Sequence, residues 1–555
     1  MRGFALVVLF GCLFLICLGT IDLLDFDEAC YAEVSREMYL SRNIITPQLN
    51  GKPFYEKPPL LYWVQVVGYR LFGLSALGAR IINALAGLVT ILVAFLFARR
   101  PLGERTAFFS SLILGGNVLF AYLSRVALTD MLLTLSLVLC LGCSYRAVED
   151  TLHKNSQGTL WFLAACLASA VAMLAKGAIG VLLPVASGFF FLLAIRRLRI
   201  LFRPLWFVPG ILIICLVGLS WYILIGLTHP DGFLFMRDLF LKHHVGRFAS
   251  PMQGHSGPIV YYIPLLLIGF LPWSPFVPLA LSRTGLFKPH DERTRFLCLF
   301  GIFAAITFVF FSLAGTKLPN YIIPVLPGLA FITATLFVDS KHTQVRGARW
   351  AIPVCTTAFL LIVLAAVLVI LPALIPRLPD ILGEDARKAP GLLLPIHLGL
   401  KPYVAAAVLA ALALAVIVAW RKNRLQALVW SLFAAAFGMI IIVFFGVMPA
   451  YNTHFAAPLT RLSVEAGKMT PKHGRVILVE LRDRPSVIFY SGKNTEHCGS
   501  GQPEKLMELL HSPDIEAGIT TDYYLSRLQE SGLDLEKLKK DTGYVLFKGG
   551  HRSSQ

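Results

Sequence analysis

The feature that most limits how this chain can fold is a series of apolar stretches that runs through residues 1–448. About thirteen of them are long enough, or nearly so, to cross the hydrocarbon core of a bilayer, which requires roughly 20 helical residues. They cover approximately residues 4–20, 78–98, 107–123, 127–145, 160–175, 178–195, 205–227, 259–282, 296–314, 322–338, 350–375, 402–420 and 427–448. Hydrophobic residues make up 56% of the 555 residues and charged residues only 15%, which excludes an ordinary soluble domain. The sequence therefore predicts an α-helical polytopic membrane protein.

Two apolar regions have unusual lengths, one too long for a single span and one short. Residues 160–195 would form a helix of about 54 Å, against a hydrocarbon core of about 30 Å, so the chain must turn within them. Lys176 and Gly177 are the expected turn, because a charge favours the interface and glycine relaxes the backbone limits. The first stretch is short enough to be a secretory signal, but no small-residue cleavage pattern follows it, and we expect a transmembrane span.

Basic residues in short loops predict the orientation, because such loops stay on the cytoplasmic side. With the N-terminus inside, all the basic loops fall on that side, namely residues 99–105, 196–203, 283–295, 341–349 and 421–424. The same topology places the long loop 21–77 and the polar tail 449–555 outside. We expect a transmembrane domain over 1–448 and a small periplasmic α/β domain over 449–555. Its expected strands are 475–481, 486–492 and 543–549, and its expected helices are 503–512 and 521–532.

Charge and cysteine content exclude two other classes of protein. The net charge of +18 comes largely from membrane-orienting residues and a basic tail, so we predict no nucleic-acid binding. Eight of the ten cysteines lie in or beside apolar spans, and only Cys30 and Cys498 lie elsewhere. This distribution implies no disulfide set.

Residues 26–38 have helical spacing and predict a helix that lies on the membrane surface. One row of its side chains is apolar and would face lipid or the bundle. The adjacent row would turn Asp27 and Tyr31 towards a cavity between the outer loops. An equally simple interpretation is an amphipathic helix whose first turn is capped by Asp27, and Asp130 could likewise be only a helix cap.

The predicted topology gathers many other polar side chains on the same outer side. They are Glu56, Lys57, Asp130, Lys176, His243, His244, Arg247, His255, Lys317 and Tyr321. Each one alone has an ordinary interpretation as a cap, an interface anchor or a loop residue. Together, carboxylates with histidine can hold a divalent metal, and lysine, arginine and tyrosine suit the oxygens of a phosphate. They predict a site for a lipid phosphate at the membrane boundary.

The segments that carry these residues resemble the GT-C class of lipid-linked sugar glycosyltransferases, in particular the bacterial aminoarabinose transferases of lipid A, which are related to protein mannosyltransferases. The matching segments are "DEACYAEVSREM", "GKPFYEKPPLLYW", "RVALTDMLL", "AKGAIGVLLP", "HHVGRFASPMQGHSGPIVYYIPLLLIGFLPWS", "KLPNYIIPVLPGLA" and "RPSVIFYSG". The resemblance implies a GT-C fold in the bacterial inner membrane. It also implies inverting transfer of a sugar, expected to be 4-amino-4-deoxy-L-arabinose, from undecaprenyl phosphate to lipid A or another glycolipid on the periplasmic side.

The same resemblance implies roles for individual residues. Asp27 would be the acid at the reaction centre, and Asp130 a second acid of the same cavity. Glu56 would bind a divalent metal (Zn, Mg or Mn) together with His244 or, in a different local alignment, His243. The residues implied in binding the donor phosphate are Lys57, Arg247 and Tyr321, with Lys176, Tyr31 and Lys317 as further candidates. Cys30 stands where members of this class commonly have arginine, so one cation that faces the phosphate is missing.

Three alternatives stay open at this point. Within the enzyme class, another sugar such as a hexose or aminohexose could be transferred to a glycolipid or a protein. A polyprenyl-lipid transporter would also need many spans, but it should show charged residues within spans and internal repeats, and neither is evident. A sensor of cations or ligands could use the acidic loop and the tail without catalysis.

Overall fold

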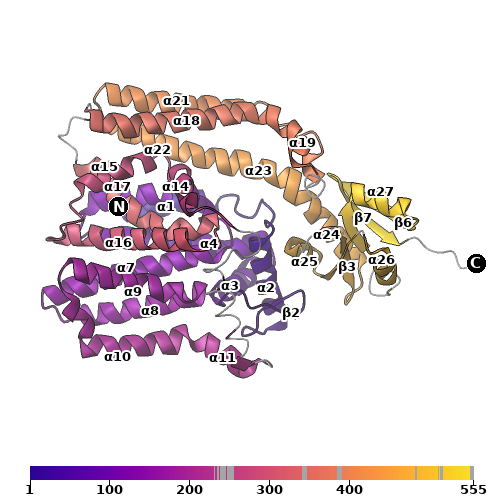
Figure 1. Ribbon diagram of the computed structural model, residues 1–555, viewed down its shortest axis with the longest axis horizontal. Coiled ribbons are helices and arrows are strands. Elements are labelled where there is room, and N and C mark those ends of the chain that lie inside the picture. The colour runs from indigo at the N-terminus through magenta and orange to yellow at the C-terminus, as the bar shows by residue number, and fades with distance from the viewer. Residues whose placement is uncertain are drawn as a thin grey trace, which may run out of the picture.

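The computed structural model consists mainly of long helices, with a small sheet domain at its C-terminal end (Figure 1). It describes all residues except 230–231, 234–236, 238–245, 247–255, 340–344, 346, 384–389, 482–483, 500, 511, 513–516 and 550–555. The long helices lie side by side in one part of the molecule, and the sheet domain lies beyond the far end of α23 and α24 (Figure 1).

Within the described residues, eight helical segments are long and apolar enough to cross a membrane. They contain α4 (Ala76–Ala98), α7 (Thr129–Leu152), α8 (Gly158–Lys176), α16 (Glu292–Leu313), η6 (Pro319–Val325) with α17 (Leu326–Asp339), α18 (Ala348–Leu374), α21 (Lys401–Arg421) and α22 (Leu425–Ile441). Three further apolar segments are sharply bent, by 69°, 44° and 111°. They are α5 (Glu104–Gly115) with α6 (Val118–Ser124), α10 (Pro204–Ile213) and η2 (Ile214–Gly218) with α11 (Ser220–Thr228), and η4 (Ile259–Tyr261) and α14 (Tyr262–Gly269) with η5 (Ser274–Phe276) and α15 (Val277–Arg283).

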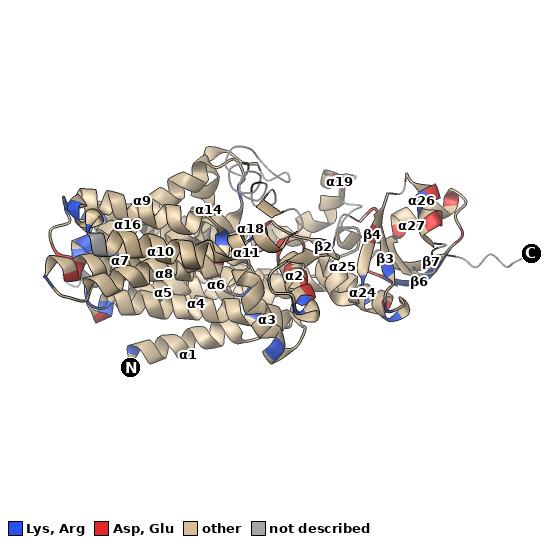
Figure 2. Ribbon diagram, turned by 90° about the horizontal axis from the view of Figure 1, so that it is seen from below, with Lys and Arg blue, Asp and Glu red and all other residues tan. Residues whose placement is uncertain are grey.

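Two shorter apolar helices, α1 (Arg2–Leu15) and α9 (Ile179–Ala194), complete the set. These segments coincide with the thirteen apolar stretches of the sequence, so the helical membrane architecture is confirmed. Length and composition support eight to eleven crossings, and the figure of thirteen stays a prediction. Charged residues gather at the ends of the bundle and on the sheet domain (Figure 2). The turn expected near Lys176 is confirmed, because α8 ends there and Gly177 has a φ of +77°.

The loop between α1 and α4 contains two helices, α2 (Asp27–Ser41) and α3 (Leu60–Phe72), and a hairpin of β1 (Gln48–Leu49) and β2 (Lys52–Pro53). The helix predicted from the spacing of residues 26–38 is confirmed as α2. Residues 28–35 of this helix are all buried by other parts of the protein, and its place on the membrane surface stays a prediction. The helix packs against α3 on one side and against α25 (Pro485–Ser491) of the sheet domain on another.

The chain leaves the bundle along one extended helical run. It consists of α22, η9 (Ile442–Val447), α23 (Met448–Tyr451), η10 (Asn452–Ala456) and α24 (Ala457–Met469). Four short elements lie elsewhere in the helical part, namely η1 (Leu198–Phe202), η7 (Ile375–Arg377), α19 (Leu378–Leu382) and η8 (Pro390–Leu392).

The sheet domain has five strands in the order β4-β3-β5-β7-β6. They are β3 (Arg475–Val479), β4 (Asn494–Cys498), β5 (Ala517–Thr521), β6 (Leu535–Asp541) and β7 (Tyr544–Gly549), with the helices α25, α26 (Pro503–Leu510) and α27 (Asp522–Glu530). Strand β3 runs parallel to β4 and β5, and β7 runs antiparallel to β5 and β6. The predicted α/β character is confirmed. The strand predicted over 486–492 is wrong, because Pro485 begins helix α25 there.

The sheet domain is fastened to the loop between α1 and α2. Asp25 accepts hydrogen bonds from the backbone N–H (3.0 Å) and the hydroxyl (2.6 Å) of Ser486 at the start of α25. The hydroxyl of Tyr490, near the end of the same helix, accepts the N–H of Leu23 at 2.8 Å. Both contacts lie just before α2, so the domain helps to fix where that helix begins.

A buried ion pair between Glu28 and Arg80 fixes the start of α2 from the other side. Both carboxylate oxygens of Glu28 lie 2.7 Å from guanidinium nitrogens of Arg80, and the two residues are 2% and 3% exposed. The remaining donors and acceptors of the pair bind backbone. Arg80 donates to the carbonyls of Leu18, Ile21 and Asp22, and Glu28 accepts the N–H groups of Leu24 and Ala127. Such a bidentate pair is strong when every partner is present and costly to break.

We predict that Arg80→Met destabilises the protein by about 3–5 kcal/mol, because it leaves the Glu28 carboxylate buried without its counter-charge. The measurement is the unfolding free energy of detergent-purified protein by denaturant titration. Arg70→Met is the matched control, since Arg70 is exposed on α3. Equal stability of the two variants would contradict a structural role for the pair.

Candidate active site

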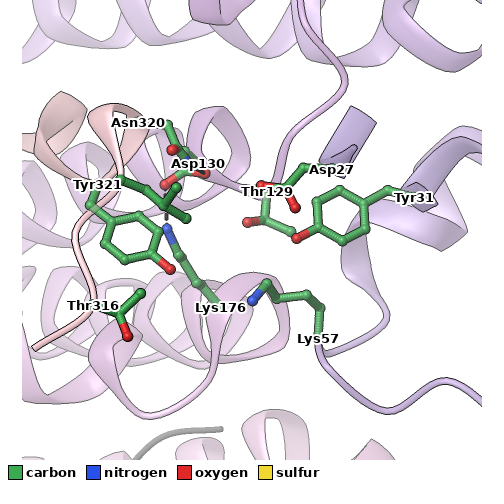
Figure 3. Close-up of a pocket in the computed structure, with 10 residues that line it drawn as sticks. Asp27, Tyr31, Lys57, Thr129, Asp130, Lys176, Thr316, Asn320 and Tyr321 are labelled. Atoms are coloured by element: carbon green, nitrogen blue, oxygen red, sulfur yellow. Dashed lines mark hydrogen bonds and ion pairs between the residues drawn. The ribbon is translucent and has the colours of Figure 1, made fainter. Parts of the chain in front are cut away.

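A small polar pocket lies where one end of the helical bundle meets the loop 21–77. Its lining residues are Asp27, Tyr31, Lys57, Thr129, Asp130, Lys176, Thr316, Leu318, Asn320 and Tyr321 (Figure 3). Six of the eleven residues predicted for the site are among them. The structure therefore brings together acids, lysines and tyrosines that lie up to 294 positions apart in the sequence (321 − 27).

The antiparallel pair α7 and α8 supplies the deepest part of the pocket. Because the two helices run in opposite directions, the first turn of α7 and the last turn of α8 lie at the same end of the bundle. This arrangement pairs the Asp130 carboxylate with the Lys176 ammonium group in a salt bridge that is buried on both sides. The other carboxylate oxygen of Asp130 accepts a hydrogen bond of 2.6 Å from the amide of Asn320.

Both carboxylate oxygens of Asp130 therefore bind other side chains, those of Lys176 and Asn320. The residue that caps α7 is Leu128, with no side-chain hydrogen bond to the helix, so the interpretation of Asp130 as a helix cap is wrong. Lys176 has a second contact, because its Nζ lies 3.8 Å from the centre of the Tyr321 ring. Two contacts from different elements hold this ammonium group in one place.

The loop 21–77 supplies the other wall. Asp27 is the first residue of α2, is half-buried, and forms no hydrogen bond or ion pair to another residue that the structure describes. The helix is capped by Phe26 without a side-chain bond, so a capping role of Asp27 is not observed. Tyr31 follows one turn later. Burial raises the pKa of its hydroxyl well above the ordinary value, so Tyr31 stays protonated and can donate a hydrogen bond.

Lys57 enters the pocket from the segment just before α3. It is 8% exposed, and Pro58 and Pro59 follow it directly, which limits the backbone freedom of the segment. Figure 3 shows the Lys57 ammonium group, the Tyr31 hydroxyl and the Asp27 carboxylate directed into the same space. The pocket thus offers two ammonium groups and two carboxylates, which can bind an anion beside a centre of developing positive charge.

Of the other five predicted residues, the structure describes two, Lys317 and Glu56, and neither lines the pocket. Lys317 lies close by in sequence, but its ammonium group donates to the carbonyls of Ser312 and Ala314, at 2.8 and 2.7 Å, near the end of α16. Glu56 is half-buried beside Lys57 and does not line the pocket. The last three, His243, His244 and Arg247, lie outside the described residues.

Sequence reasoning missed three polar lining residues, Thr129, Thr316 and Asn320. Two of them have a signal in the sequence, since Thr129 precedes Asp130 and Asn320 lies within "KLPNY". Cys30, which stands at the place of a common arginine, is 2% exposed, packs in the apolar core and does not line the pocket.

Among the described residues, one group of three could hold a metal ion: Glu149, His153 and Glu292. It lies at the opposite end of α7, because Glu149 is 19 residues beyond Asp130, or about 29 Å along the helix. Both oxygens of Glu149 are already bound by Arg295, at 2.6 and 2.8 Å. This group therefore provides no metal for the polar pocket.

The fold of this chain is similar to that of a membrane protein of known structure. The crystal structure of ArnT from Cupriavidus metallidurans bound to undecaprenyl phosphate matches it with a TM-score of 0.78, at 23% identity, over 98% of this chain and 97% of that one. Residues 1–232 match the family model described as dolichyl-phosphate-mannose-protein mannosyltransferase. The resemblance to the GT-C class that the sequence motifs predict is confirmed by these matches.

Two relatives of known name are more similar to this chain in sequence. The chain is 31% identical over 360 residues to the undecaprenyl phosphate-alpha-4-amino-4-deoxy-L-arabinose arabinosyl transferase of Shewanella sediminis. It is 34% identical over 334 residues to the protein of the same name from Edwardsiella ictaluri. The matches cover 64% and 60% of this chain, and 63% and 58% of those relatives, which is less than two thirds of their length.

We predict that the Asp130 and Lys176 charges are energetically coupled. Lys176→Met and Asp130→Asn should each destabilise the protein by about 3–5 kcal/mol, because each leaves one buried charge unpaired. The double variant should lose clearly less than the sum, since neither charge is then present. Denaturant titration in detergent measures all three variants.

The exposed pair of Lys548 and Glu536, at 3.0 Å, is the control for this cycle. Lys548→Met and Glu536→Gln should show coupling below about 1 kcal/mol, as exposed pairs do. Additive effects at Asp130 and Lys176 would contradict the coupling.

Proposed function

We propose that this chain is an inverting glycosyltransferase that moves 4-amino-4-deoxy-L-arabinose from undecaprenyl phosphate to a lipid A phosphate. The observation that carries the proposal is the polar pocket, where Lys57 and Lys176 face Asp27 and Asp130 at the end of an apolar helical bundle. A lipid-linked sugar phosphate has the matching chemistry, with a long apolar chain, one anionic group and a sugar carbon that becomes positive during transfer. Two relatives, 31% and 34% identical to this chain over 360 and 334 residues, carry undecaprenyl phosphate and 4-amino-4-deoxy-L-arabinose transfer in their names.

The phosphate of the donor is the leaving group. As the bond between the sugar C1 and the phosphate oxygen breaks, negative charge grows on that phosphate, and a cation accelerates the step only by binding this charge better than the ground state. Lys57 meets it in our proposal, and the Tyr31 hydroxyl, kept protonated by burial, donates to a phosphate oxygen. Lys176 is held by Asp130 and Tyr321, so it provides a positive charge at a fixed position.

Asp27 acts on the sugar side of the same reaction. An acceptor phosphate is already anionic and attacks C1 from the face opposite the leaving group, so it needs orientation more than a general base. Asp27 stabilises the positive charge that develops on the sugar as the bond breaks. Its carboxylate has no partner among the described residues, which suits a group whose partner arrives with the substrate.

A divalent metal bound by Glu56 with His244 or His243 stays part of the proposal. The support is that Glu56 directly precedes Lys57, which lines the pocket, and that divalent ions prefer carboxylate and imidazole ligands. A metal there would add positive charge near the leaving phosphate, while the contacts of Lys57, Tyr31 and Lys176 do not depend on it.

The test of the proposal is Asp27→Asn, which keeps the shape of the side chain and removes its charge. Transfer of sugar from purified undecaprenyl-phosphate donor to lipid A by reconstituted protein should fall by on the order of 100-fold or more, with the melting temperature unchanged. Asp534→Asn, on the exposed surface of the sheet domain, should transfer at the wild-type rate. A variant at Asp27 that keeps more than about half of the wild-type activity would remove this residue from the reaction centre.

We also propose that the pocket faces the periplasm, since the basic loops at the other end of the bundle favour the cytoplasmic side. An alkaline phosphatase reporter fused after Thr470, at the end of α24, should be active, and one fused after Arg199 should be inactive. A cytoplasmic reporter should give the opposite pattern at both sites. Activity of the phosphatase after Arg199 would contradict the proposed orientation.

A further inference from the structure

A second, larger pocket lies away from the polar site, between α18, α21 and the helical run that leads to the sheet domain. Its volume is about 490 Å³, within the roughly 300–1,000 Å³ of most small-molecule sites. Its walls are largely aliphatic, with Leu368 and Leu371 from α18 and Ile442 and Val447 from η9. A chamber of this kind suits hydrocarbon chains.

Three basic side chains of described residues line the same pocket: Lys401, His397 and His454. Lys401 is the first residue of α21, and none of the described residues that line the pocket is acidic. Within the described part of the chain, the side chains of these three residues form no hydrogen bond or ion pair. An apolar chamber with unpaired positive charge at its edge is complementary to a lipid with an anionic headgroup.

The wall opposite α18 has an unusual backbone. Both η9 and η10 are π-helical, and such wide turns are frequently found at functional sites. A Cβ atom added to Gly446 in η9 would meet no other atom within 4 Å, so the pocket is open there. At Gly391 in η8 an added Cβ would lie only 2.3 Å from the carbonyl oxygen of His454, so η8 and η10 close tightly against each other.

The pocket adjoins surfaces that suit the bilayer. Large apolar side chains beside it are exposed, among them Ile370 on α18, Leu400 just before α21 and Val404 on α21, at 57%, 77% and 60%. In a membrane protein such surfaces face acyl chains. A lipid can therefore enter from the side, without passing through water.

We propose that this pocket binds an anionic glycerophospholipid of the surrounding bilayer. Its acyl chains fill the apolar chamber, and its phosphate is bound by Lys401 with His397 and His454. The inference is independent of the proposed transferase activity, since it concerns a lipid that does not react.

The contacts on the other face of the helical run indicate that the bound lipid is a structural lipid and not a substrate. There the guanidinium group of Arg125 lies 4.5 Å from the centre of the Phe444 ring, and Asn452 accepts the N–H of Asp22 at 2.9 Å. The run and these contacts stand between the large pocket and the loop that leads to Asp27. A phosphate bound at Lys401 is thus separated from the polar pocket, while the lipid supports the helices that hold the loop.

The experiment is native mass spectrometry of the full-length protein in detergent, titrated with dioleoyl phosphatidylglycerol and, as a neutral probe, with dioleoyl phosphatidylcholine. Wild type should retain phosphatidylglycerol in preference. Lys401→Ala should bind it roughly fivefold more weakly, the effect of one basic residue near a headgroup. Gly446→Leu should bind it on the order of tenfold more weakly, because its side chain occupies the chamber.

Each variant has a matched control. Lys422→Ala changes an exposed lysine at the other end of α21, and Gly188→Leu adds the same side chain at a helical glycine whose Cβ would also meet nothing within 4 Å. Both should bind as the wild type does. The controls separate loss of the pocket from general effects of charge or bulk.

Two results would overturn the inference. One is equal binding of phosphatidylglycerol by Gly446→Leu and the wild type. The other is displacement of the phospholipid by lipid A, together with a raised KM for lipid A and an unchanged kcat in Gly446→Leu, which would make the pocket an acceptor site. If the wild type binds phospholipid as expected but transfers no sugar, the proposed function is contradicted and the lipid-binding inference is not.

Discussion

The position of the candidate site depends on the buried ion pair between Glu28 and Arg80. Glu28 follows Asp27 directly, and its carboxylate also accepts the N–H of Ala127, three residues before Asp130. The Glu28 side chain therefore connects the start of α2 to the segment just before α7. This connection holds Asp27 and Asp130 at the same end of the bundle. Charged groups in such an environment are stable only when all their partners are present, so the pair fixes the loop as well as the helices.

The apolar helices were the part of the fold that the sequence could predict. Their signal is local, because a bilayer demands about 20 apolar residues in a row and satisfaction of every backbone group within the helix. The burial of α2 could not be predicted from such a local signal. Its pattern suits a surface helix, but α3 and α25 cover it from two sides, and α25 comes from a segment more than 400 residues later. The same contact explains the wrong strand at 486–492, since β-branched and aromatic residues there pack as a short helix.

The sequence could predict which charged residues lie on one side of the membrane. It could not predict which of their side chains contact each other. Topology places Lys57, Asp130 and Lys176 on the same side, but it does not say which charges pair. The salt bridge of Asp130 with Lys176 follows from the antiparallel packing of α7 and α8, and Asn320 joins it from η6. Lys317, only three residues before Asn320, is bound to carbonyl groups near the end of α16. Neighbouring residues of one motif thus have different surroundings, which no spacing rule distinguishes.

The helical run from α22 to α24 contacts three parts of the molecule. One face lines the large apolar pocket, the other contacts Arg125 and Asp22, and its end begins the sheet domain. The sheet domain in turn binds Asp25, two residues before Asp27, through Ser486. A shift of this run would therefore reach the loop twice, once through Asn452 and once through the sheet domain. The run also contains two π-helical turns, and a Cβ atom added to Gly446 in the first of them would meet no other atom within 4 Å, so open space lies beside the run there.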